Sequence, residues 1–154
     1  MNPRLRRLQA DYEQVMGVFS SHPRIRVVAA EGTPPEKYVV EFRVLGLLSG
    51  GEKSCVQGSV HRAEIFLPMD YPRRPPFCRM ITPVFHPNID PQKICIGDHW
   101  SAGQRLAQLI VRIGEMITYQ SYNVKSPLNG EAAAWAQLNQ DQLPLEKIDL
   151  AQGL

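Results

Sequence analysis

The sequence predicts an α+β domain in which a helix leads into an antiparallel meander and further helices follow a proline-rich stretch. Three observations carry this prediction. The chain has 154 residues, of which 44% are apolar and 21% charged, as expected of one ordinary globular domain. Apolar residues recur at helical spacing towards both ends and alternate at strand spacing in between. The turns between the strands are short, which favours antiparallel neighbours.

The first element is predicted as a helix over residues 3–19. Its apolar stripe recurs every three or four residues and comprises Leu5, Leu8, Tyr12, Val15, Met16 and Phe19. The polar residues are expected mainly on the other side of the helix; they are Arg6, Arg7, Gln9 and Asp11. The sequence before Pro23 ends the helix, because a residue that precedes proline avoids helical geometry.

Three strands are predicted next, over residues 25–30, 38–48 and 57–67. Apolar and polar side chains alternate along the second of them, and glycine-containing turns separate all three. Seven prolines then fall between residues 68 and 91 and leave room for one short strand at residues 77–81. Proline fixes the backbone, so this region is predicted to be rigid and irregular, as the loops that hold functional sites often are.

Two helices are predicted after the proline-rich region. The first runs from about Ser101 to Thr118, with Ser101 as its N-cap. The second begins near Gly130. The polar tail from Asp141 is either one more short helix or frayed.

Composition and charge exclude several classes of protein. The net charge of +2 is too balanced to indicate nucleic-acid binding. No apolar run is long enough to span a membrane, and the N-terminus lacks the features of a secretory signal, so a cytoplasmic location is expected. The three cysteines, Cys55, Cys78 and Cys95, are odd in number and include no CxxC pair. They therefore favour buried or reactive thiols over a disulfide framework.

Short motifs along the second half of the chain occur in a distinctive order. They are Tyr71-Pro72-Arg73-Arg74-Pro75-Pro76, His86-Pro87-Asn88, Ile94-Cys95-Ile96, Trp100-Ser101 and Pro127-Leu128-Asn129. Together with the basic N-terminal helix and the meander, this order resembles the ubiquitin-conjugating enzymes. The resemblance covers nearly the whole chain, so residues 1–154 are expected to form a single UBC-like catalytic domain. It implies an N-terminal helix, a four-stranded antiparallel meander sheet, a proline-rich active-site loop and C-terminal helices.

The resemblance implies an acyl-carrier role for Cys95. Its thiol would take a ubiquitin-like protein as a thioester from an activating enzyme and pass it to an amine, usually a lysine, without a metal or organic cofactor. From composition alone, a cysteine between two isoleucines would be interpreted as core filler. Asn88 is expected to stabilise the oxyanion or to hold the nearby loop. A metal site on Cys95, His99 and His86 is disfavoured because the cluster contains one thiol.

Supporting residues are predicted on both sides of the cysteine. His86 is expected to be structural, alongside Pro87 and Trp100. The family usually has an aspartate two residues after the cysteine and another before the Pro-Leu-Asn turn, but this chain has Gly97 and Ser126 there. Serine carries no charge unless it is modified, so Ser126 is kept only as a supporting residue. The group that activates the lysine is therefore unassigned, and its candidates are Asp98, Tyr122 and Asn123. These departures suggest a divergent, prokaryote-style branch.

The resemblance also implies surfaces for partner proteins. A ligase would dock on Pro72, Arg73, Ser101 and Ala102, although many members that work with RING-type ligases carry an apolar or aromatic residue where this chain has Arg73. The activating enzyme would use a face formed by Arg4, Arg6 and Arg7, for which a plain solvated helix face is an equal alternative.

Two other functions compete with the conjugating enzyme. One is a non-catalytic ubiquitin-binding module of the same fold, against which the presence of Cys95 argues. The other is a cysteine hydrolase that uses His86 as its base, for which the sequence offers no orienting acid at a recognisable spacing.

Overall fold

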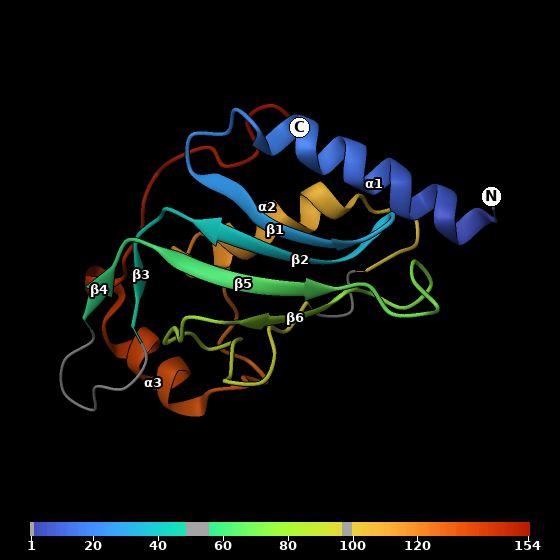
Figure 1. Ribbon diagram of the computed structural model, residues 1–154. Helices are drawn as coiled ribbons and strands as arrows, with labels where there is room; N and C mark the ends of the chain where they lie inside the picture. The colour runs from blue at the N-terminus through green and yellow to red at the C-terminus, as the bar shows by residue number, and fades with distance from the viewer. Residues whose placement is uncertain (1, 49–55, 97–99) are drawn as a thin grey trace.

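A computed structural model of the chain describes residues 2–48, 56–96 and 100–154 (Figure 1). The helices are α1 (Pro3–Phe19), α2 (Leu106–Ile117) and α3 (Gly130–Leu138), followed by a short 3₁₀ helix (Gln140–Gln142). The strands are β1 (Ile25–Gly32), β2 (Pro35–Phe42), β3 (Gly46–Leu47), β4 (Gln57–Gly58), β5 (His61–Phe66) and β6 (Phe77–Met80). No described helix is long and apolar enough to cross a bilayer.

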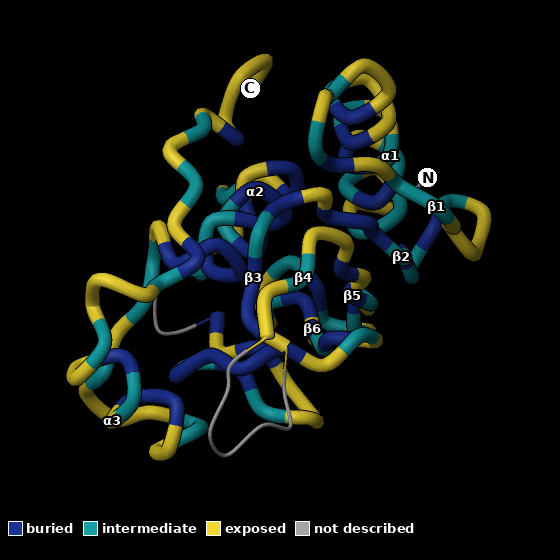
Figure 2. Tube along the Cα trace, turned by 90° about the vertical axis from the view of Figure 1, so that its left-hand side faces the viewer, coloured by how far each residue is buried: buried dark blue, intermediate teal, exposed yellow. Residues whose placement is uncertain are grey.

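Four strands form an antiparallel sheet in the order β1-β2-β5-β6, which confirms the predicted meander. The inner face of the sheet packs against α1 and α2, and side chains such as Val40, Ile65 and Ile110 are fully buried between these layers. A smaller core of five buried residues lies under α3, at the opposite end of the molecule from α1 (Figure 2).

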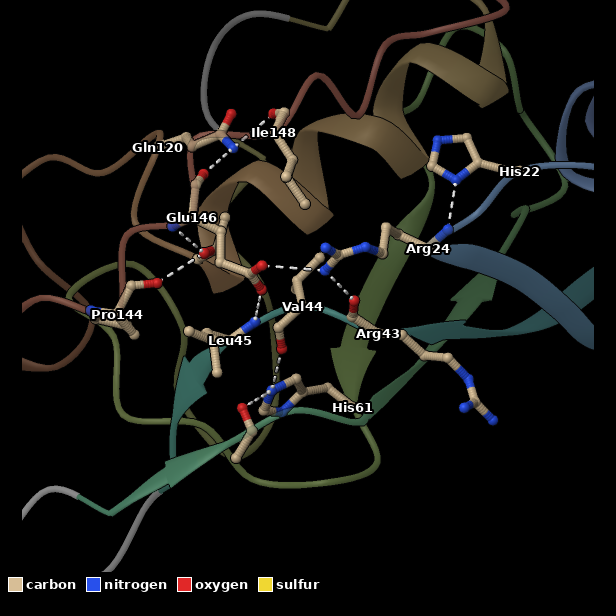
Figure 3. Close-up of polar contacts among 12 residues, drawn as sticks. His22, Arg24, Arg43, Val44, Leu45, His61, Gln120, Pro144, Glu146 and Ile148 are labelled. Atoms are coloured by element: carbon tan, nitrogen blue, oxygen red, sulfur yellow. Dashed lines mark hydrogen bonds and ion pairs between the residues drawn. The ribbon is translucent and has the colours of Figure 1, made fainter.

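The predicted second strand, residues 38–48, is wrong as a single element. The chain leaves the sheet after β2 because distant groups take over its backbone hydrogen bonds. Leu45 donates its N–H to the Glu146 carboxylate (2.5 Å), and the Arg43 carbonyl accepts from Arg24 (Figure 3). The chain then pairs again as β3 with β4, and a Cβ atom at Gly46 would lie 2.7 Å from the Ile117 side chain. The close approach explains the glycine.

The predicted helix start at Ser101 is also wrong. The helix α2 begins five residues later, and the Arg105 N–H is capped by the Gln108 side chain (3.1 Å). The carbonyl oxygens of Ala102 and Gln104 accept hydrogen bonds from the Arg7 guanidinium instead of from helical N–H groups. A side chain of α1 therefore delays the helix. In contrast, α1 and α3 begin where predicted, because Asn2 and Asn129 cap them locally (2.8 and 3.0 Å).

The face assignments in α1 need two corrections. Asp11, predicted on the polar side, is 4% exposed, whereas Met16, predicted in the apolar stripe, is 37% exposed. Asp11 is buried because Arg7, one helical turn earlier, pairs with its carboxylate at 2.9 Å.

The C-terminal tail is neither helical nor frayed after its 3₁₀ turn. It runs back along α2 towards α1, and Leu150 is 1% exposed against the core. The Gln120 amide donates to the carbonyl oxygens of Glu146 and Ile148, and the Glu146 carboxylate pairs with Arg24 at 3.0 Å (Figure 3). These contacts make the tail part of the folded domain.

Candidate active site around Cys95

The segment at residues 93–96 presents Cys95 to solvent while its neighbours are buried. Lys93 and Cys95 are exposed, and Ile94 and Ile96 point into the core. The Ile94 N–H donates to the Cys78 carbonyl of β6 (2.8 Å), and the Cys95 N–H donates to the Asn88 carbonyl on the other side (2.9 Å). Backbone hydrogen bonds in both directions therefore fix where the thiol stands.

The three cysteines occupy different environments. Cys78 is buried, and burial raises the pKa of its thiol, which favours the inert protonated form. Cys95 is exposed and lines a shallow, open groove. Cys55 lies outside the described residues. Among the described thiols, Cys95 is thus the one placed to react.

The groove at Cys95 has one rigid wall. That wall is formed by Pro75 and Pro76 and by the start of β6, where Phe77 is 51% exposed. The other wall is the segment at residues 93–96. The arrangement offers an open approach to the thiol along a largely apolar surface.

His86 is part of the interior. Its side chain is 1% exposed, its ring lies 4.7 Å from the Tyr119 ring, and its Nδ1 accepts the Asn88 N–H at 3.0 Å. Burial lowers the pKa of His86 to about 4, although the backbone of Ser121 and Met116 works in the opposite direction. The imidazole is therefore neutral at ordinary pH, and it accepts a backbone hydrogen bond within the turn.

Asn88 joins the turn before the cysteine to the loop before Pro127. Its Nδ2 donates to the Asn123 carbonyl and its Oδ1 accepts the Asn123 N–H, both at 2.8 Å. The neighbouring Pro87 carbonyl accepts the N–H groups of Leu128 and Asn129 (2.8 and 3.0 Å). Hydrogen bonds of Asn88 thus connect Asn123 and Cys95 to the same turn. No local sequence pattern predicts these contacts.

The other residues predicted to support the site are placed differently. Tyr122 packs its ring 5.2 Å from that of Tyr119. Ser126 is exposed and adopts a left-handed backbone with φ of 53°. Asp98 lies outside the described residues, as do Gly97 and His99. Among the described residues, no group of three or more His, Cys, Asp or Glu side chains could hold a metal ion.

Trp100 anchors the proline-rich loop. Its Nε1 donates to the Pro72 carbonyl at 2.7 Å, and its ring lies 5.8 Å from the ring of Tyr71. Arg73, Ser101 and Ala102 are exposed at this end of the molecule. The residues predicted to form a ligase surface therefore lie on two loops, one of which Trp100 holds.

The three arginines of α1 do not share one exposed face. Arg7 pairs with Asp11 and donates to the Tyr71 hydroxyl at 3.0 Å, and that hydroxyl donates to Asp11 at 2.5 Å. Arg4 donates to the Pro68 carbonyl at 3.0 Å. Arg6 is the one of the three that is exposed. The spacing of Arg7 and Asp11 was the sequence signal for this hub, and the prediction of a partner face overlooked it.

Comparisons with known proteins point to one family. The family model described as "Ubiquitin-conjugating enzyme" matches residues 8–147. The Drosophila melanogaster protein named "Ubiquitin-conjugating enzyme E2 N" is 32% identical over 111 residues, which cover 70% of this chain and 71% of that protein. The Schizosaccharomyces pombe "Ubiquitin-conjugating enzyme E2 13" is 28% identical over 120 residues, covering 75% of this chain and 76% of its own.

A solved structure shows the same fold. It is titled "Crystal structure of a putative ubiquitin conjugating enzyme from Plasmodium yoelii", and it superposes with a TM-score of 0.65 at 20% identity, covering 92% of this chain and 88% of its own. The prediction of a UBC-like α+β fold is confirmed. The family model and the Drosophila relative lead to one conclusion: the chain belongs to the ubiquitin-conjugating enzyme family, whose members are cysteine-thioester transferases.

Proposed function

We propose that Cys95 accepts the C-terminal acyl group of ubiquitin or a ubiquitin-like protein as a thioester from an activating enzyme, and that the acyl group then passes to an amine, usually a lysine. The observation that carries this proposal is the exposed thiol of Cys95 on a segment pinned from both sides by backbone hydrogen bonds. A fixed, accessible thiol suits acyl transfer, because a thioester is readily formed from another thioester and readily attacked by an amine.

Asn88 supports the transfer step in this proposal. When an amine attacks the thioester, negative charge develops on the carbonyl oxygen, and a fixed N–H donor stabilises it. One N–H of the Asn88 amide is committed to the Asn123 carbonyl. The second N–H is available for the oxyanion, and the clasp to Asn123 fixes its direction. Holding the loop and stabilising charge are thus two consequences of one geometry.

The loop clasped by Asn88 is proposed to receive the incoming amine. It carries Tyr122, Asn123 and the exposed Ser126, and it is joined to Asn88 through the Asn123 backbone. These side chains can orient an amine by hydrogen bonds. Asp98 is the one acidic residue among the predicted candidates for lysine activation.

The partner surfaces follow from the exposed residues. Arg6 is proposed for contact with the activating enzyme, since Arg4 and Arg7 are engaged within the chain. A ligase, where one is used, is proposed to contact Arg73 and the exposed Ser101–Ala102 turn. Arg7 would support that turn indirectly, because it binds the Ala102 carbonyl.

The test is a charging assay with ubiquitin, an activating enzyme and ATP. A thiol-sensitive adduct is expected with the wild-type chain and with Cys78→Ala, which removes the buried thiol of the same groove. The adduct should be lost in Cys95→Ala. An adduct that survives in Cys95→Ala, or none with any pairing of modifier and activating enzyme, would refute the proposal.

The same assay separates the competing functions. A non-catalytic module would bind the modifier without a thiol-sensitive adduct. A hydrolase would release the modifier without an acceptor amine and would depend on His86 as its base. The burial of His86 and its packing against Tyr119 leave that hydrolase without support.

A further inference from the structure

Lys93 and Cys95 project from the same side of one segment. Exposure alternates along residues 93–96, with the lysine and the cysteine outside and Ile94 and Ile96 inside. Successive N–H groups of Ile94 and Cys95 point to opposite partners, as in an extended chain. In such a segment, residues two apart are separated by about 7 Å along the chain. The flexible four-carbon stem of a lysine can bend along the chain and bring its amine to a group attached to the sulfur.

The backbone that carries Lys93 is fixed. Asp90 Oδ1 accepts the N–H groups of Gln92 and Lys93 (2.8 and 2.9 Å), and the Lys93 carbonyl accepts the Asp90 N–H at 3.0 Å. The Asp90 oxygen is thus occupied by the backbone. The side chain of Lys93 starts from a fixed point two residues before the thiol.

The amine of Lys93 is free of charged partners within the described part of the chain. Lys37, by comparison, pairs with Glu31 and Glu64. No ion pair or hydrogen bond between described residues engages the Lys93 Nζ, and the residue is exposed. Its amine can therefore move towards the thiol without breaking another contact.

The groove that Cys95 lines is also lined by Lys93. Lys93 and Cys95 line the same wall, and the facing wall consists of Pro75, Pro76 and Phe77. Prolines cannot yield by rotating φ, so the facing wall is rigid. A chain attached to the sulfur and lying in this groove has the lysine beside it.

We propose that Lys93 is an internal acyl acceptor, so that the loaded enzyme modifies itself on this lysine. The unprotonated Lys93 Nζ attacks the thioester carbonyl carbon, a C–N bond forms, and the C–S bond breaks. The Cys95 sulfur leaves as a thiolate, and the proton lost by the nitrogen passes to solvent or to that thiolate. An isopeptide on Lys93 and a regenerated Cys95 result. The proposal rests on the acyl-carrier role of Cys95.

The test uses a small probe that needs no recognition by an activating enzyme. The full chain is incubated with the mercaptoethanesulfonate thioester of acetyl-glycyl-glycine, then treated with hydroxylamine, which cleaves thioesters and spares amides. Peptide mass spectrometry locates the remaining acyl group. The variants are Cys95→Ala, Lys93→Arg and the matched control Lys125→Arg, which alters an exposed lysine of the loop clasped by Asn88. Arginine preserves the charge but is not an acyl acceptor.

The expected result is a hydroxylamine-resistant group on Lys93 in the wild type and in Lys125→Arg. It should fall by roughly tenfold or more in Cys95→Ala, because the intramolecular route is lost. In Lys93→Arg the thioester on Cys95 should still form, while the resistant group disappears from this segment. The conversion per loaded molecule should not change when the protein is diluted.

Three outcomes would overturn the proposal. Equal labelling of Lys93 in Cys95→Ala would mean direct acylation by the probe. A rate proportional to protein concentration would mean transfer between molecules. A stable Cys95 thioester without any product on Lys93 would refute the role of Lys93 as an internal acceptor and would leave the acyl-carrier role of Cys95 intact. Failure to form the thioester at all would refute the carrier role itself, so the two failures are distinguishable.

Discussion

The clasp between Asn88 and Asn123 gives the sharpest prediction for the proposed chemistry. Substitution Asn88→Ala removes both 2.8 Å hydrogen bonds to the Asn123 backbone. Each such bond contributes roughly 0.5–1.5 kcal/mol, so the free energy of unfolding should fall by about 1–3 kcal/mol. For a domain of this size, each kcal/mol lowers the melting temperature by roughly 2–4 °C. The expected decrease in melting temperature is therefore about 2–12 °C.

The two steps of the reaction should respond unequally to this change. The Cys95 N–H binds the backbone carbonyl of Asn88, which alanine retains, so loading of Cys95 should stay close to wild type. Discharge of the thioester onto free lysine should slow by about 10²–10³-fold, since the amide donor for the oxyanion is gone.

A single-turnover assay measures the second step alone. The enzyme is loaded with labelled ubiquitin, activation is stopped by removing ATP, free lysine is added, and loss of the thioester is followed. Lys125→Ala is the matched control, because it removes an exposed side chain of the same loop and keeps the backbone atoms that Asn88 binds. Wild-type discharge in Asn88→Ala would refute the oxyanion role, and an unchanged melting temperature would refute the clasp.

Three further predictions concern stability. His86 has a pKa of about 4 in the folded chain against its ordinary value of 6.5, so between these pH values the unfolded chain binds a proton that the folded chain does not bind. The free energy of unfolding should therefore fall as the pH drops from 6.5 to 4, by up to about 1.4 kcal/mol per pH unit. Equal pH dependence of this free energy, measured by urea unfolding, in the wild type and in His86→Asn would contradict the prediction. Arg7→Ala should lower the free energy of unfolding by roughly 3–5 kcal/mol, because it leaves the buried Asp11 carboxylate without its cation. Arg6→Ala should change the same free energy, measured by urea unfolding, by less than about 0.5 kcal/mol. Leu150→Ala should lower the free energy of unfolding by about 2–5 kcal/mol, whereas Leu154→Ala, at an exposed position, should leave it almost unchanged. Equal melting temperatures for these two variants would show that the tail does not complete the core.

The elements that sequence predicted well are those whose signals are local. Alternating side chains and short turns gave the antiparallel sheet, because neither depends on distant residues. The starts of α1 and α3 follow from Asn2 and Asn129, which cap N–H groups three residues ahead. The acyl-carrier role of Cys95, inferred from ordered motifs, stays a prediction, to which the structure adds the exposure of the residue and its groove.

The elements that sequence placed wrongly are those set by distant partners. The end of β2 depends on Glu146, about a hundred residues further along the chain, whose carboxylate takes the Leu45 N–H. The start of α2 depends on Arg7, which captures carbonyls that a longer helix would have used. Periodicity measures which face a residue prefers, and it carries no information about a polar group that arrives from another element. The burial of Asp11 has the same origin.

The last prediction concerns how the incoming amine loses its proton. The loop clasped by Asn88 contains no aspartate or glutamate between Tyr119 and Ser126, so its side chains can position an amine but cannot supply a carboxylate base. Free lysine is mostly protonated near neutral pH, since its ε-amine has a pKa of about 10.4. If the enzyme relies on the unprotonated fraction, discharge onto free lysine should rise about tenfold per pH unit from pH 7 to pH 9, and Asp98→Asn should leave that slope unchanged. A rate that is already flat at pH 7 in the wild type and becomes steep in Asp98→Asn would assign the base to Asp98 and refute this reasoning.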